Sequence, residues 1–252
     1  MFPIIVRFGE FAIHSYGVML ALAFFIGIWL AEKRAVEAGI DKKLVSDLGF
    51  WILISAVVGA RLLYVLLHPA EFQNDPFEII AIWRGGLMFF GGFLLALVVG
   101  IYFAKKNRIK VLTLGDIIAA PIALGIFLTR IGCFLNGCCF GIPTTLPIGV
   151  RFPKGCAASY SPVGDQPLLP TQLISSLFGL LLFFYLEKRR PRAKHGELFG
   201  TTLFAYGLFR FLIDFVRYYE DSANYLTNQI VAVGVAVIGF IILYRSAVKK
   251  SD

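Results

Sequence analysis

Charged residues are scarce in this 252-residue chain, at 16% of the total, whereas hydrophobic residues make up 58%. With a mean hydropathy of +0.77, the chain has too few polar side chains to cover a water-soluble fold. The alternating apolar and polar pattern of a membrane β-barrel is also missing. These deficits exclude a soluble protein and a barrel, and they favour membrane helices, which satisfy their backbone internally.

Other features are missing as well. The sequence has no internal repeat, low-complexity segment or interdomain linker, so we expect one membrane domain over residues 1–252. The N-terminus lacks a basic region and a small-residue cleavage site, which argues against a removable signal peptide. The four cysteines include no C-x-x-C pair, the spacing typical of a thiol redox relay.

Seven apolar runs approach the roughly 20 residues of helix that cross a bilayer. The predicted spans are Ile13–Leu30, Leu48–Leu67, Gly85–Ala104, Leu114–Arg130, Leu168–Leu186, Leu198–Phe215 and Ala223–Tyr244. Asp116 and Pro121 interrupt the fourth span, and Arg210 and Asp214 interrupt the sixth. The predicted fold class is therefore all-α, a polytopic membrane protein with seven transmembrane helices.

Basic residues predict the orientation. Sixteen of the 24 lie in alternate loops: Lys33, Arg34, Lys42, Lys43, Lys105, Lys106, Arg108, Lys110, Lys188, Arg189, Arg190, Arg192, Lys194, Arg245, Lys249 and Lys250. Such loops stay cytoplasmic, so we expect the N-terminus outside, the C-terminus in the cytoplasm, and a small outer segment between spans four and five. The net charge of +8 is spread over loops rather than gathered on one soluble face, which argues against nucleic-acid binding.

Seven of the eight remaining basic residues are arginine: Arg7, Arg61, Arg84, Arg130, Arg151, Arg210 and Arg217, beside Lys154. Arginine presents a planar fork of donors that grips phosphate oxygens in pairs. An arginine at the centre of a membrane helix costs about 2.5–3.5 kcal/mol on insertion scales, so an anionic partner is expected. Arg61, Arg130 and Arg210 fall in the predicted outer half of the bilayer, where we expect them to share a pocket for a lipid phosphate.

Structural interpretations compete with this one. A single arginine near a helix end commonly reaches the interface or pairs with a carboxylate, as Arg210 could with Asp214 one turn away. The paired glycines Gly91 and Gly92 are favoured for helix packing by their spacing alone, although glycine also admits a lipid headgroup. Tyr16 has the position of an interfacial belt residue, or its hydroxyl could hold a headgroup.

The cysteines Cys133, Cys138, Cys139 and Cys156 all lie on the predicted outer face. That face is oxidising in most bacteria, so we expect first a disulfide from Cys156 to Cys138 or Cys139. Free thiols are the alternative. Four thiolates could bind zinc, but their spacing is irregular, and the sequence predicts neither a metal nor a cofactor.

Six motifs in register resemble those of the prolipoprotein diacylglyceryl transferases, membrane enzymes that lipidate bacterial lipoprotein precursors. The motifs are Gly59-Ala60-Arg61-Leu62 with Tyr64, Trp83 to Gly92, Arg130 to Gly141, Pro170-Thr171-Gln172-Leu173, Tyr206-Gly207-Leu208-Phe209-Arg210-Phe211, and Leu226-Thr227-Asn228-Gln229. Arg130 to Gly141 resembles the family signature. The resemblance covers nearly the whole chain.

The resemblance implies transfer of a diacylglyceryl group from phosphatidylglycerol to the lipobox cysteine of a prolipoprotein, with glycerol phosphate as leaving group. It implies an inner-membrane enzyme with its site towards the outer leaflet, and we expect a monomer. The implied catalytic residues are Tyr16, Arg130, Arg210 and Asp214, with Asp214 orienting Arg210. The implied substrate-binding residues are Arg61, Gly91, Gly92, Cys133, Asn136, Gly141, Arg217 and Gln229.

The chain departs from the family pattern in several places. Many members have histidine, the usual candidate base, where Phe90 stands, and His14 and His68 are outer-side substitutes. Many members have asparagine and glutamate where Cys133 and Cys138 stand. The motif at span five continues with Ile174 and Ser175 instead of tyrosine and glutamate.

These departures allow a divergent member with altered or lost activity. A transporter or lipid-binding protein with an arginine-lined outer pocket is a second alternative, although no repeated half is present. A seven-span photoreceptor would need a lysine in the last span, and a thiol oxidase would need C-x-x-C. Both are absent, so the transferase interpretation is favoured.

Overall fold

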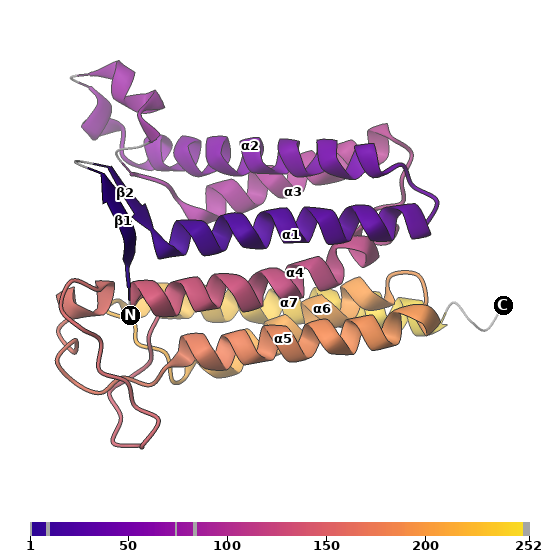
Figure 1. Ribbon diagram of the computed structural model, residues 1–252. Coiled ribbons are helices and arrows are strands. Elements are labelled where there is room, and N and C mark those ends of the chain that lie inside the picture. The colour runs from indigo at the N-terminus through magenta and orange to yellow at the C-terminus, as the bar shows by residue number, and fades with distance from the viewer. Residues whose placement is uncertain (1, 9–10, 74, 83–84, 249–252) are drawn as a thin grey trace. The chain divides into compact units, whose positions relative to one another are not determined.

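The computed structural model describes residues 2–8, 11–73, 75–82 and 85–248 (Figure 1). Trp83 and Arg84 of the glycine-rich motif, and the basic Lys249 and Lys250, lie outside the described residues. The described chain contains seven long helices: α1 (Ser15–Glu37), α2 (Lys42–Leu67), α3 (Phe89–Lys106), α4 (Val111–Asn136), α5 (Thr171–Arg189), α6 (Glu197–Asp214) and α7 (Ser222–Val248). Each overlaps one predicted span, with ends that differ by up to seven residues.

Four of the described helices, α1, α2, α4 and α7, are long and apolar enough to cross a membrane. Large apolar side chains such as Leu181, Phe184 and Phe240 are exposed on the helix surfaces, where a soluble protein would place polar groups. The protein is therefore a polytopic membrane protein. The count of seven spans and the orientation stay predictions.

The structure supports the all-α class, and it adds a small antiparallel hairpin of β1 (Ile4–Phe8) and β2 (Phe11–His14) that the sequence did not predict. Strand β1 contains the β-branched run Ile4-Ile5-Val6, which fits a pleated strand better than a helix. Ser15 ends the hairpin, and its amide donates to the carbonyl of Pro3 over 3.0 Å at the start of α1.

Two boundary predictions were wrong. Helix α3 begins at Phe89, because Gly85 and Gly86 have positive φ and lie outside the helix. Helix α4 continues through Pro121 and ends at Asn136, so Arg130 lies inside the helix rather than at its end. Asp116 does not break α4 either, since its carboxylate accepts hydrogen bonds from the Gly196 and Phe199 amides at the start of α6.

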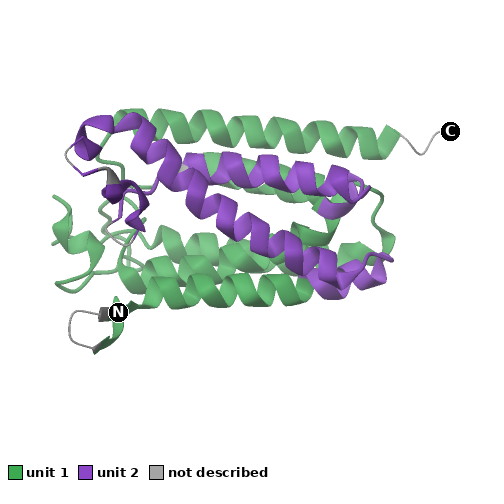
Figure 2. Cartoon of the chain, turned by 90° about the horizontal axis from the view of Figure 1, so that it is seen from above, with its two compact units in different colours: residues 1–30, 115–252 green, residues 31–114 purple. Residues whose placement is uncertain are grey.

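The chain divides into two compact units, coloured separately in Figure 2. The first comprises residues 1–30 and 115–252, and the second comprises residues 31–114. In the second unit, α2 and α3 approach closely, because Gly59 and Gly91 face each other and a Cβ on either would clash with the other's carbonyl. Short 3-10 helices, η1 (Pro69–Phe72) and η2 (Pro76–Ile80), follow α2.

In the first unit, small residues allow several helix contacts. A Cβ at Gly207 of α6 would lie 2.5 Å from the Ala236 amide nitrogen of α7. Gly179 of α5 approaches the backbone of α4 at Phe127 in the same way, and the Ser176 hydroxyl donates to the Phe127 carbonyl over 3.0 Å. Small-residue contacts of this kind draw membrane helices together.

Between α4 and α5 runs the connecting segment, residues 137–170, which includes η4 (Ala157–Tyr160). It has its own apolar core, formed by Phe140, Phe152, Cys156, Ala158 and Leu168. Short strand-like bridges join Leu168 to Pro143 and to Val150. The predicted small segment between spans four and five is therefore folded onto a core rather than a bare loop.

Candidate active site

Arg130 lies on α4, six residues before the helix ends, and its guanidinium has the side chain of Tyr206 on α6 as a hydrogen-bond partner. Gly132, one half-turn further on, allows α1 to approach, because a Cβ there would lie 2.9 Å from the Cβ of Met19. Tyr16 is on the same helix as Met19 and is 38% exposed, within electrostatic range of Arg130. The structure therefore brings two predicted catalytic residues together.

After α4 the chain turns sharply. Gly137 has φ of +74°, a conformation that costs glycine little, and a Cβ there would lie 2.7 Å from the Cβ of Cys156. Cys139 also has a positive φ, of +62°, which is strained for a residue with a side chain. The cysteines of the signature are therefore oriented by an unusual backbone rather than by a regular helix or strand.

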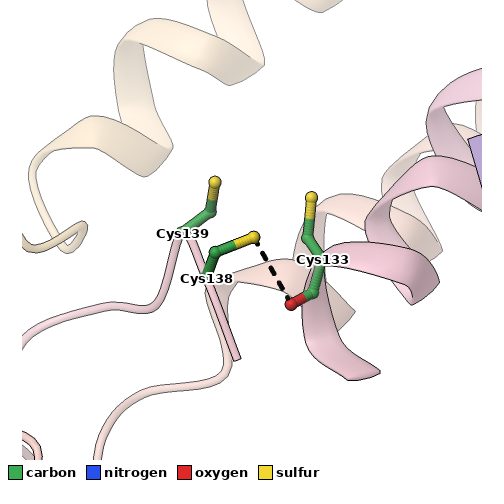
Figure 3. Close-up of side chains that lie close together, drawn as sticks. All are labelled: Cys133, Cys138 and Cys139. Carbon is green, nitrogen blue, oxygen red and sulfur yellow. Dashed lines mark hydrogen bonds between the residues drawn. The ribbon is translucent and has the colours of Figure 1, made fainter. Parts of the chain in front are cut away.

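The turn gathers Cys133, Cys138 and Cys139, whose Sγ atoms all lie within 4.8 Å of one another; we call these residues the cysteine cluster (Figure 3). The Cys138 thiol donates to the carbonyl of Cys133 over 3.7 Å, and the Asn136 side chain is also a hydrogen-bond partner of Cys138. All four cysteines are free. The expected disulfide from Cys156 was wrong, because that thiol is buried in the core of the connecting segment.

The start of α5 holds the backbone of the cluster. The Thr171 hydroxyl donates to the Cys139 carbonyl over 2.8 Å, and the Gln172 Nε2 donates to the Cys138 carbonyl over 2.8 Å. Both side chains are fully buried, and Gln172 Oε1 has no hydrogen-bond partner among the described residues. The motif Pro170-Thr171-Gln172-Leu173 therefore acts by fixing the signature turn.

Arg217 reaches the signature through a strand-like pairing with Gly141. The Ile142 amide donates to the Val216 carbonyl over 3.0 Å, and the Tyr218 amide donates to the Phe140 carbonyl over 3.1 Å. Glycine is required, because a Cβ at Gly141 would lie 2.6 Å from the Val216 oxygen. This close pairing fixes the backbone around Arg217, and the role of Gly141 in the site stays a prediction.

Arg210 and Asp214 form the ion pair that their spacing suggested, with 3.1 Å between Nη2 and Oδ1. Tyr219 joins them, because its hydroxyl accepts from Arg210 Nη2 and donates to Asp214 Oδ1, each over 2.7 Å. The ring of Tyr219 also lies under the guanidinium of Arg217, 5.3 Å from Cζ to the ring centroid. Tyr219 therefore connects two of the predicted arginines.

The surroundings of Cys139 and Tyr219 shift the pKa values of both side chains. Hydrogen bonds from the thiols of Cys133 and Cys138, then the positive charges of Arg217 and Arg130, lower the pKa of the Cys139 thiol. Burial raises the pKa of Tyr219 to about 12, so its hydroxyl stays protonated and can donate to Asp214. Arg130 and Arg217 thus both act on Cys139, and Tyr219 contacts both Arg217 and Arg210. We call Arg130, Arg210 and Arg217 the arginine set.

A comparison with protein families matches residues 3–245 to the family described as prolipoprotein diacylglyceryl transferase. The chain belongs to this family. Relatives named phosphatidylglycerol–prolipoprotein diacylglyceryl transferase include one from Aeromonas salmonicida, 35% identical over 92% of this chain and 83% of the relative. One from Bordetella bronchiseptica is 37% identical over 85% of this chain and 82% of the relative. One from Fusobacterium nucleatum is 31% identical over 86% of this chain and 88% of the relative.

Three residues implied by the family resemblance belong to the second unit. Gly91 and Gly92 are buried where α3 meets α2, and a Cβ at Gly92 would lie 2.6 Å from the Ala56 carbonyl oxygen. This is the contact that the helix-packing alternative requires. A role of either glycine in substrate binding stays a prediction.

The third residue, Arg61, is buried and donates to backbone carbonyls of its own unit. Its Nε bonds Ile79 at 2.9 Å, its Nη1 bonds Gly85 at 2.8 Å and Gly86 at 3.1 Å, and its Nη2 bonds Glu78 at 2.5 Å. Four of the five N–H donors of the guanidinium are thus occupied. Its predicted phosphate contact, and its sharing of a pocket with Arg130 and Arg210, stay predictions.

Gln229, in the family motif that opens the last helix, donates from Nε2 to the Phe211 carbonyl over 3.2 Å. Its buried Oε1 has no hydrogen-bond partner among the described residues. Of the two histidines weighed as substitutes for the family histidine, His68 stacks on Tyr64 at 4.3 Å, and His14 ends strand β2.

Three contributors to the site escaped the sequence reasoning. Tyr219 lies beyond the end of α6, where no helical spacing connects it to Asp214. Thr171 and Gln172 were noted only as part of a motif, and their partners are main-chain carbonyls, which leave no trace in a sequence. For Tyr219, the one available signal was its position two residues after Arg217.

Proposed function

We propose that this protein transfers the diacylglyceryl group of phosphatidylglycerol to the lipobox cysteine of prolipoproteins, releasing glycerol phosphate. The observation that carries the proposal is the arginine set, three guanidinium groups connected through Cys139 and Tyr219 beside the family signature. The printed names of the relatives specify the same lipid and the same class of protein acceptor.

The chemistry needs positive charge at one place. The lipobox sulfur attacks the diacylglyceryl carbon, the bond from that carbon to the phosphate oxygen breaks, and its electron pair stays on the oxygen. A phosphodiester with one negative charge becomes a monoester with two. Fixed arginines stabilise the charge that grows in the transition state, and their paired donors fit phosphate oxygens.

In this proposal the arginines bind the phosphate, and their neighbours position them. Asp214 and Tyr219 orient Arg210, and the pairing of Gly141 with Val216 and Arg217 orients Arg217. The buried Oδ2 of Asp214 has no hydrogen-bond partner among the described residues, so it is also available to accept a proton. Tyr16, Asn136 and Gln229 are assigned to contacts with the headgroup or the acceptor peptide.

A divergent member with altered activity is the second candidate. It is favoured by Phe90, which stands where many members have a histidine, and by the cysteines at positions 133 and 138. Both candidates share the lipid site, so a direct assay of transfer separates them.

The assay combines purified protein, phosphatidylglycerol vesicles and a lipobox peptide, and measures the peptide mass. We expect a diacylglyceryl mass increase on the cysteine peptide and none on a peptide with serine in its place. Arg130→Ala should lose transfer at least about 100-fold while still inserting into membranes. The control is Arg151→Ala in the connecting segment, where an exposed arginine bonds only the Asp165 carbonyl in the described structure. Full activity of Arg130→Ala would remove its assigned role.

We further propose that the enzyme lies in the bacterial inner membrane as a monomer, with the arginine set towards the outer leaflet. The distribution of lysine and arginine between alternate loops supports this orientation. A reporter fused after Lys250 should stay cytoplasmic, and one inserted in the connecting segment after Lys154 should be exported. Export of the C-terminal reporter would contradict the orientation.

A further inference from the structure

The cysteine cluster has the arrangement of a thiolate metal site. Its three sulfurs lie within 4.8 Å of one another, and Zn²⁺ bound at about 2.3 Å from each would bring them to about 3.8 Å apart. The cluster therefore needs to contract by about 1 Å, which side-chain rotation of Cys138 and Cys139 can supply. Sequence spacing argued against a metal, but the turn at Gly137 and Cys139 removes that objection.

The backbone around the cluster is held in place. Cys133 is fixed in the last turns of α4, and the carbonyls of Cys138 and Cys139 accept from the buried side chains of Gln172 and Thr171. The strained positive φ of Cys139 is thus maintained by α5. Strain of this kind persists where the surrounding structure over-determines it, and it is frequent at functional sites.

Charge also favours an occupied site. Three thiolates around a divalent cation carry a net charge of minus one, and Arg130 and Arg217 act on Cys139 from close range. Thiolates are soft ligands that select ions such as Zn²⁺ and Cu⁺. Structural zinc sites have four protein ligands, whereas catalytic sites have three and keep one position open.

The proposed transfer reaction needs a thiolate, and an incoming thiol can reach the cysteine cluster. Cys133 is buried, but Cys138 and Cys139 are partly accessible, and the exposed Tyr16 lies within electrostatic range of all three sulfurs. Arg130 and Arg217 of the arginine set act on the same cluster. A thiol that entered there would meet a metal ion on one side and the lipid phosphate on the other.

We propose that Cys133, Cys138 and Cys139 bind Zn²⁺ and that its fourth position takes the lipobox thiol of the acceptor peptide as a thiolate. This inference rests on the proposed function. The thiol proton leaves to water when sulfur binds the metal. The sulfur then attacks the diacylglyceryl carbon, its new thioether leaves the metal, and the carbon–oxygen electron pair departs with glycerol phosphate. The metal keeps its oxidation state, and no oxidant or reductant is consumed.

The proposal explains how this chain can function with Phe90 where many relatives have histidine. A metal-coordinated thiol is deprotonated outright, so a separate base is not required. It also explains the cysteines at positions 133 and 138 together, since each supplies one thiolate ligand to the same metal ion.

The first test is metal binding by reduced, purified full-length protein in detergent without oxygen. Co²⁺ is the spectroscopic probe, because thiolate ligation gives intense near-ultraviolet charge-transfer bands, and Zn²⁺ competition then reports affinity. Wild type and Cys156→Ala should bind one equivalent. Cys133→Ser, Cys138→Ser and Cys139→Ser should each bind at least about 100-fold more weakly. Cys156→Ala is the matched control, because Cys156 is a free cysteine outside the cluster.

The second test is ligand exchange at the open position. A lipobox peptide should shift the Co²⁺ bands of the wild type, and the matching peptide with serine for cysteine should not. Chelation of Zn²⁺ should lower transfer at least about 10-fold, with recovery when Zn²⁺ is added back.

The outcomes separate this inference from the proposed function. Transfer by wild-type protein that binds no Co²⁺ or Zn²⁺ would overturn the metal site and leave the function intact. Equal metal affinity in wild type and Cys133→Ser would do the same, as would a Cys133–Cys138 disulfide in the active enzyme. Co²⁺ bands that do not change when the lipobox peptide is added would contradict the proposal that the fourth metal position takes its thiol. Metal and peptide binding without any transfer would instead count against the proposed function.

Discussion

The hydroxyl of Tyr219 donates a 2.7 Å hydrogen bond to Asp214 Oδ1 and accepts another of equal length from Arg210. The side chain of Asp214 is fully buried, and that of Arg210 is only 13% exposed. A buried charge is stable only when it is paired and hydrogen-bonded. Arg210 therefore has its orientation fixed from two directions.

Replacement of either partner should loosen Arg210. Asp214→Asn should lower kcat by about 10- to 100-fold, because a hydrogen bond to a charged group contributes about 1.5–3 kcal/mol. Tyr219→Phe should lower kcat about five-fold. The double variant should lower kcat by less than the product of the two single decreases. Transfer kinetics over a range of phosphatidylglycerol concentrations check this. If Asp214 acts as the base instead, Asp214→Asn should show a changed pH profile, whereas Tyr219→Phe should not.

The raised pKa of Tyr219 predicts a loss of stability at alkaline pH. The unfolded chain would ionise this phenol near pH 10, whereas burial holds the folded group protonated to about pH 12. Between these values the folded state binds more protons, so its free energy of unfolding falls as pH rises. Between pH 9 and pH 12, the Tm should fall more steeply with rising pH in the wild type than in Tyr219→Phe. An equal fall of Tm with pH in the two proteins would contradict a buried, protonated Tyr219 hydroxyl.

Gly141→Ala should displace Arg217. The added Cβ would lie 2.6 Å from the Val216 carbonyl oxygen, so the pairing between the signature and the end of α6 must shift. Overpacking of this kind costs about 1–3 kcal/mol, and a 1 Å misplacement of a reacting group can lower kcat about 100-fold. Gly125→Ala on α4 is the control, since its Cβ would meet open space. Transfer at normal rates by Gly141→Ala would mean that Arg217 does not depend on this contact.

Gly91→Ala distinguishes packing from substrate binding. A Cβ at Gly91 would clash with the Gly59 carbonyl, so we expect a lower Tm in detergent, equivalent to about 1–3 kcal/mol. Gly100→Ala, at an open position on the same helix, should not lower the Tm. A raised KM for phosphatidylglycerol at unchanged Tm would support the substrate-binding role instead.

Helix positions could be predicted from the sequence because uncharged apolar runs of bilayer length rarely form anything but membrane helices. The residues that interrupt the apolar pattern of the fourth span do not break its helix. Pro121 lies inside α4 without ending it, and the Asp116 carboxylate accepts hydrogen bonds from amides at the start of α6. The β1–β2 hairpin was missed, because five and four residues give too short a pattern to stand out.

The site could be predicted only in part. Arg210 and Asp214 are one helical turn apart, so their pairing followed from spacing. The cysteine cluster did not, because a positive φ at Cys139 decides where its sulfur points. The close pairing of Gly141 with Val216 depends on two segments about 75 residues apart, whose contact no local pattern encodes.

Arg61 grips the peptide oxygens of residues 78, 79, 85 and 86. Every amino acid carries such an oxygen, so evolution can rewrite the side chains at 78 and 79 without disturbing the grip. Gly85 and Gly86 have less latitude, since both need a positive φ. A single side chain on α2 thus holds two separate pairs of residues, 78 with 79 and 85 with 86, and the loss of that one arginine would release both.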